Sequence, residues 1–159
     1  MPTLYPLPDG LKIKSILGLL FEDIEVSPGG KFDGSATSGA WFGVYINDAG
    51  APVALCASDA QLSAYWSAAL SVLPVAIARD AAKQRSLNEM MIANLREIMN
   101  ICTRLVMSEH SPHLRLENVY RAGQLPQAAA ALVTGARGRT DFQVALPKYG
   151  SGQLALLSN

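Results

Sequence analysis

The sequence has little charge, and the charge that it has is balanced. Only 16% of the 159 residues are charged, and lysine plus arginine equals aspartate plus glutamate at 13 each. A chain without net charge creates no overall field that would gather phosphate backbones or anionic lipids, so we expect no nucleic-acid partner. Half of the residues are hydrophobic, which excludes a disordered chain and predicts a globular protein with surplus apolar surface. A homodimer would cover that surplus.

The sequence also lacks a long hydrophobic run. No stretch of about 18 apolar residues is present to cross a bilayer, and residues 1–10 contain three prolines and no basic stretch. We therefore expect a cytoplasmic protein with no membrane segment. Cysteine is scarce as well: Cys56 falls in a predicted strand and Cys102 on an apolar helix stripe, so both are expected to be buried free thiols.

Several common chemistries have no sequence support. There is no G-x-x-x-x-G-K-[ST] loop, no G-x-G-x-x-G between a strand and a helix, and no histidine in the context of a nucleophilic triad. Glu109, His110 and His113 are metal-binding residue types, but three ligands from five residues spanning a proline would need an improbable geometry, so we expect no metal site. The basic cluster Arg137-Gly138-Arg139 is interpreted as a solvated loop without a function.

The length predicts one domain over residues 1–159, with residues 1–10 as an irregular N-terminal segment. Apolar periodicity predicts helices over residues 11–21, 62–70, 75–85, 87–107 and 124–133. Alternation and turn residues predict strands over 23–26, 41–46, 52–57, 114–120, 140–146 and 153–157. Asp9, either Ser58 or Asp59, and Ser86 are the expected helix N-caps. This order predicts an α+β fold, an α/β sandwich in which helices cover a mixed, largely antiparallel sheet.

The long helix over residues 87–107 carries a polar pair on its outer side. Its apolar residues recur at 4,3,4,3 spacing and form one stripe: Met91, Leu95, Ile98, Cys102 and Leu105. At roughly 100° per residue, Asn100 points almost directly away from this stripe and Glu97 about 120° from it. The two side chains are therefore expected to be neighbours facing solvent. A glutamate and an amide held this way can dock a basic group and position a water, although surface residues of many helices show the same pattern.

The element order, together with E-x-x-N on the long helix, resembles the CheC/CheX family of chemotaxis phosphatases. The likeness is to the CheX-type members, which carry one such motif. It spans roughly residues 42–157: the hairpin 42–57, the helix 60–73, the stretch Leu95-Arg96-Glu97-Ile98-Met99-Asn100-Ile101, and the strands 141–157.

The resemblance implies a CheX-like phosphatase that hydrolyses the phosphoaspartate of a CheY-like response regulator. Glu97 would bind a basic side chain near the phosphorylation site, and Asn100 would insert beside the acyl phosphate. An amide that orients an in-line water suits a reaction in which the protein mainly positions groups. The resemblance implies no cofactor of the chain's own, since Mg²⁺ would come from the regulator.

Two positions depart from the family pattern and are expected to affect partner binding. The family often has serine or aspartate four residues before the glutamate and glycine four after the asparagine, where this chain has Ala93 and Arg104. Ala93 keeps the surface open, whereas Arg104 adds a long cation beyond Asn100. The alternative function is thus a non-catalytic CheX-like module that binds a receiver domain or another signalling partner. A ligand-sensing domain would require a sizeable apolar pocket with convergent polar groups, which the sequence does not indicate.

Overall fold

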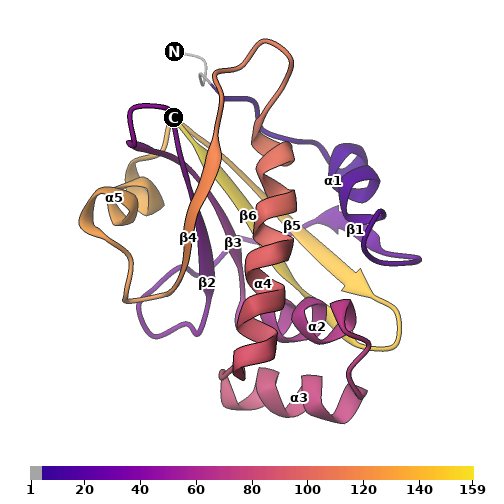
Figure 1. The fold of residues 1–159 in the computed structure, drawn as a ribbon. Helices are drawn as coiled ribbons and strands as arrows, with labels where there is room; N and C mark the ends of the chain where they lie inside the picture. The colour runs from indigo at the N-terminus through magenta and orange to yellow at the C-terminus, as the bar shows by residue number, and fades with distance from the viewer. Residues whose placement is uncertain (1–4) are drawn as a thin grey trace.

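The computed structural model describes residues 5–159, in which six strands form one sheet with helices on both faces (Figure 1). Their order across the sheet is β1-β5-β6-β3-β2-β4, and every neighbouring pair is antiparallel. The predicted α+β class is confirmed, and the described sheet is antiparallel throughout instead of mixed. The strands are β1 (Glu25–Pro28), β2 (Trp41–Ile46), β3 (Pro52–Ser58), β4 (Arg115–Arg121), β5 (Gly138–Leu146) and β6 (Gly150–Ser158).

The helices divide unequally between the two faces of the sheet. Figure 1 shows α1, α2 and α4 on one face and α5 on the other, with α3 packed on α2 at the edge of the molecule. Among residues 5–159, no helix is both long and apolar enough to cross a membrane. The helices are α1 (Gly10–Leu17), α2 (Ala60–Leu70), α3 (Val75–Gln84), α4 (Glu89–Ile101) and α5 (Gln127–Gly135), and a 3-10 segment η1 (Cys102–Val106) continues α4.

Side-chain alternation along the central strands gives the sheet a core on each face. In β2, Trp41 and Tyr45 join the core beneath α1, α2 and α4, whereas Phe42 and Val44 join the core beneath α5. All six residues of β2 are buried, which agrees with a strand that is covered on both sides. The cysteine prediction is confirmed, since Cys56 and Cys102 are buried and free.

Short polar side chains begin three of the helices. Asp9, Asp59 and Asn88 each accept a hydrogen bond at 2.8 Å from a backbone N–H in the first turn of α1, α2 and α4. The predicted caps at Asp9 and Asp59 are thus confirmed. The prediction of Ser86 is wrong, because the Ser86 N–H is bonded to the Ala81 carbonyl and closes the end of α3.

The first predicted helix differs at both of its ends. It stops at Leu17 and not at 21, because Gly18 ends it. Gly10 already belongs to α1, although residues 1–10 were predicted to be irregular, and residues 1–4 of that prediction lie outside the described residues. Tyr5 is buried, and its carbonyl accepts a hydrogen bond at 3.1 Å from the Ser158 hydroxyl at the end of β6.

Candidate functional site

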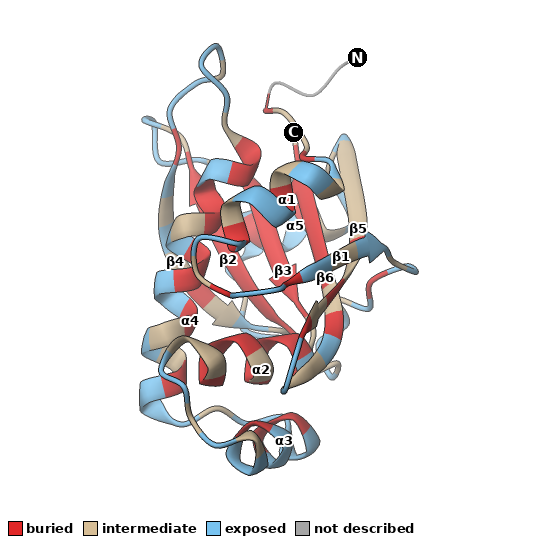
Figure 2. Ribbon diagram, turned by 90° about the vertical axis from the view of Figure 1, so that its right-hand side faces the viewer, coloured by how far each residue is buried: buried red, intermediate tan, exposed pale blue. Residues whose placement is uncertain are grey.

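The outer side of α4 presents the polar pair predicted from the sequence. Leu95 and Ile98 are buried in the core against the sheet, and Met91 is buried among the alanines of α2 and α3. Figure 2 shows the buried side of α4 turned inward. Glu97 and Asn100 are both exposed, as the stripe predicted. The apolar side therefore holds the helix in place while the opposite side remains open to a partner.

Ala93 and Arg104 are exposed as well, but they sit on different kinds of helix. Ala93 lies on α4, whereas Arg104 lies on η1, where the chain turns more tightly at about 3.0 residues per turn. The α-helical spacing used to place Arg104 directly beyond Asn100 therefore does not apply to it. Within residues 5–159, neither Glu97 nor Arg104 takes part in an ion pair. Both charges are accessible to another molecule.

Strand β2 contacts α4 at the residue that precedes Asn100. The buried Tyr45 hydroxyl donates a hydrogen bond of 2.6 Å to the Met99 carbonyl in the last turn of α4. Burial raises the pKa of Tyr45 well above its usual value, so the hydroxyl keeps its proton and remains a donor. The exposed Asn100 is thus next to a backbone position that is held from inside.

Gly43 in the same strand allows this close approach. A Cβ at Gly43 would lie 3.1–3.3 Å from three side-chain atoms of Met99, tighter than ordinary van der Waals contact. The sequence does contain an indication of this contact, because a glycine inside a strand often marks the close approach of another element. The partner of that glycine was not apparent from the sequence.

A second contact fixes α4 to the end of α2. The side-chain amide of Asn94 donates to the Ser67 carbonyl at 2.9 Å and to the Ser71 hydroxyl at 2.7 Å. Asn94 lies one turn before Glu97, so the helix is held once before the polar pair and again at Met99, between its two residues. Spacing alone did not single out Asn94, because its partners lie on another helix.

The remaining candidates from the sequence behave differently. Glu109, His110 and His113 are exposed, and the described residues contain no group of three side chains able to hold a metal ion. His113 instead lies 3.1 Å from the carboxylate of Asp48. The interpretation of Arg139 as part of a solvated loop is wrong: it lies in β5 and pairs with Asp141 at 2.9 Å, and both side chains are partly buried. Strand pairing with β6 extends further toward the N-terminal end of β5 than its sequence pattern indicated.

Comparison with known proteins gives structural likeness without sequence matches. No family model and no curated protein matches the chain. The crystal structure of the CheX-CheY-BeF₃-Mg²⁺ complex from Borrelia burgdorferi matches with a TM-score of 0.55 and 15% identity, covering 94% of this chain and 97% of that one. FliY from Thermotoga maritima and the FliM middle domain from H. pylori match with TM-scores of 0.49 and 0.45, at 11% and 9% identity; each match covers 94% of this chain, with 81% of the FliY chain and 82% of the FliM chain. The likeness to the CheX-CheY structure, with its TM-score of 0.55, shows that the arrangement of sheet and helices described above is a CheC/CheX-like fold.

Proposed function

We propose that this protein is a CheX-like phosphatase that hydrolyses the phosphoaspartate of a CheY-like response regulator. The observation that carries the proposal is the exposure of Glu97 and Asn100 on one open side of a helix whose other side is buried. The similar structure from Borrelia burgdorferi is a complex of CheX with CheY, which supports a receiver domain as the partner. The proposal places the protein in the cytoplasm with the receiver, as a homodimer.

In the proposed reaction, water attacks the phosphorus while the bond from phosphorus to the aspartyl oxygen breaks. The products are inorganic phosphate and the free carboxylate of the regulator. The Asn100 carboxamide oxygen accepts a hydrogen bond from the attacking water and so aligns it opposite the leaving oxygen. Both Mg²⁺ and the phosphoaspartate belong to the regulator, so this chain contributes position and charge and no cofactor of its own.

Glu97 acts as the docking group in this proposal. Its exposed carboxylate binds a basic side chain of the regulator. This contact sets how far Asn100 enters the phosphorylation site of the regulator. Ala93, one turn earlier, leaves room for the regulator, and Arg104 meets an acidic part of its surface. The contacts at Met99 and Asn94 hold the helix rigid, which lowers the entropic cost of aligning the water.

The test measures phosphate release and binding separately on a panel of CheY-like receivers phosphorylated with acetyl phosphate. We expect Asn100→Ala to lower the acceleration by about 100-fold while the complex still forms, because positioning is lost and docking is kept. Glu97→Ala should weaken the complex by roughly fivefold or more. Gln127→Ala removes an exposed carboxamide from α5 on the opposite face and Glu89→Ala an exposed carboxylate from the start of α4, and both should act like wild type.

Two results would overturn the proposal. Acceleration by Asn100→Ala equal to that of wild type would exclude the water-positioning role. A stable complex with no acceleration by wild type on any receiver would instead support the non-catalytic module, in which the exposed Arg104 and Glu97 serve binding alone.

A further inference from the structure

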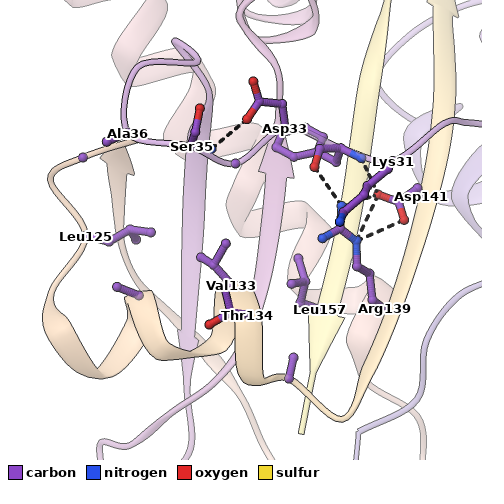
Figure 3. Close-up of a pocket in the computed structure, with 15 residues that line it drawn as sticks. Lys31, Asp33, Ser35, Ala36, Leu125, Val133, Thr134, Arg139, Asp141 and Leu157 are labelled. Atoms are coloured by element: carbon purple, nitrogen blue, oxygen red, sulfur yellow. Dashed lines mark hydrogen bonds and ion pairs between the residues drawn. The ribbon is translucent and has the colours of Figure 1, made fainter.

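A groove lies on the face of the sheet opposite α4. It has a volume of about 1120 Å³ and runs between α5 and residues 31–36, with β5 and β6 beneath (Figure 3). Apolar side chains from separate segments line it, among them Phe32, Leu125, Val133 and Leu157. This volume is slightly above the range of about 300–1,000 Å³ that is usual for small-molecule sites, and the apolar lining is typical of them. The groove arises because the short α5 is the one described helix on this face.

One guanidinium is fixed at the end of this groove. The Nε and Nη2 atoms of Arg139 donate to the Asp141 carboxylate at 2.9–3.2 Å, and Nη2 also donates to the Phe32 carbonyl at 2.9 Å. Asp141 accepts the Phe32 N–H at 3.1 Å, so the same carboxylate holds both the arginine and the wall of the groove. In the described part of the chain, Nη1 of Arg139 enters none of these bonds. The arginine is thus oriented by two of its nitrogens and keeps the third as a donor.

The charges around the groove restrict what it can bind. Lys31 and Arg139 are cationic, and Asp33 and Asp141 are anionic, so the lining has no net charge. Asp33 accepts the N–H of Ser35 at 2.9 Å, and this hydrogen bond lowers the pKa of its carboxyl. A polyphosphate would meet two carboxylates without a matching excess of cations. A single carboxylate needs only the free donor of Arg139, and an apolar body then fits the walls.

We propose that this groove binds a small organic acid with one carboxylate and an apolar body. The carboxylate accepts a hydrogen bond from Nη1 of Arg139, and the body lies on Leu157 between Val133 and Phe32. The sheet separates this site from Glu97 and Asn100. Ligand binding in the groove therefore does not depend on the proposed phosphatase activity.

The first test titrates the intact protein with octanoate, 1-octanol and inorganic phosphate, and follows binding by calorimetry and by the rise in melting temperature. We expect saturable one-to-one binding of octanoate, binding of 1-octanol weaker by about tenfold or more because it lacks the charged acceptor, and none of phosphate. Equal affinity for octanoate and 1-octanol, or no saturable binding of octanoate, would overturn the proposal.

The second test uses two neighbouring alanines of α5, both exposed. Ala130 lines the groove and Ala131 does not, so Ala130→Trp should fill the groove and abolish octanoate binding, whereas Ala131→Trp should bind as wild type does. Arg139→Lys keeps the charge but loses the planar group held by Asp141, and it should reduce the preference for octanoate over 1-octanol. If Ala130→Trp binds octanoate with the affinity of wild type, octanoate binds outside the groove and the proposal is wrong.

Discussion

At the scale of single residues, Met99 is where the sheet holds the end of α4 that carries Asn100. Tyr45 donates to its carbonyl, and Gly43 lets its side chain pack closely on β2. The sequence predicted that Glu97 and Asn100 face solvent, because exposure follows from helical period alone. It did not predict the support behind them, because Tyr45 and Met99 are 54 positions apart and meet only in the fold.

The role of the Tyr45 hydroxyl predicts a measurable loss of stability. Tyr45→Phe keeps the ring but leaves the Met99 carbonyl buried without this donor, which should lower the free energy of unfolding by about 1–3 kcal/mol. Urea unfolding measures the loss. Tyr120→Phe is the matched control, because its hydroxyl donates to the carboxylate of the exposed Glu117, and it should change stability by less than about 0.5 kcal/mol. Equal stability of the two variants would show that the Met99 contact does not hold α4.

At the scale of elements, helix starts were easier to predict from the sequence than helix ends. Asp9 and Asp59 cap α1 and α2 as expected, since a capping side chain acts within three residues of itself. The long helix was predicted to continue to residue 107, because its apolar stripe continues through Cys102 and Leu105. The residues after Ile101 nevertheless form a 3-10 segment that still buries both side chains, so apolar spacing did not distinguish the two helix types.

The end of α2 contains a conformation that its residue disfavours. Val72 has a φ of 53°, in the left-handed region that β-branched residues disfavour. Because Val72 is 83% exposed, burial of its side chain does not offset the strain of this conformation. Val72→Gly should therefore raise the free energy of unfolding by about 1 kcal/mol. The same kind of change at Ile77, inside α3, should lower it by about 1 kcal/mol, because glycine disfavours a helix interior. Thermal unfolding of both variants checks the opposite signs, and destabilisation by Val72→Gly would contradict the account of this turn.

At the scale of the whole molecule, the antiparallel sheet separates two surfaces with different chemistry. One face carries α4 and its polar pair, and the other carries the groove beneath α5. The element order predicted the α+β class, since periodicity and turn residues report on local structure. The groove was not predictable, because its lining comes from residues 31–36, 123–141 and 157, which no sequence pattern brings together. Arg139 was taken for a solvated residue for the same reason: its partner Phe32 is 107 positions away.

The most direct measurement is the rate of phosphate release from a phosphorylated CheY-like receiver at saturating concentrations of wild type, Asn100→Ala and Gln127→Ala. We expect wild type and Gln127→Ala to accelerate release equally, and Asn100→Ala to be slower by about 100-fold although it still binds the receiver. If Asn100→Ala accelerates release as much as wild type does, this side chain does not position the attacking water.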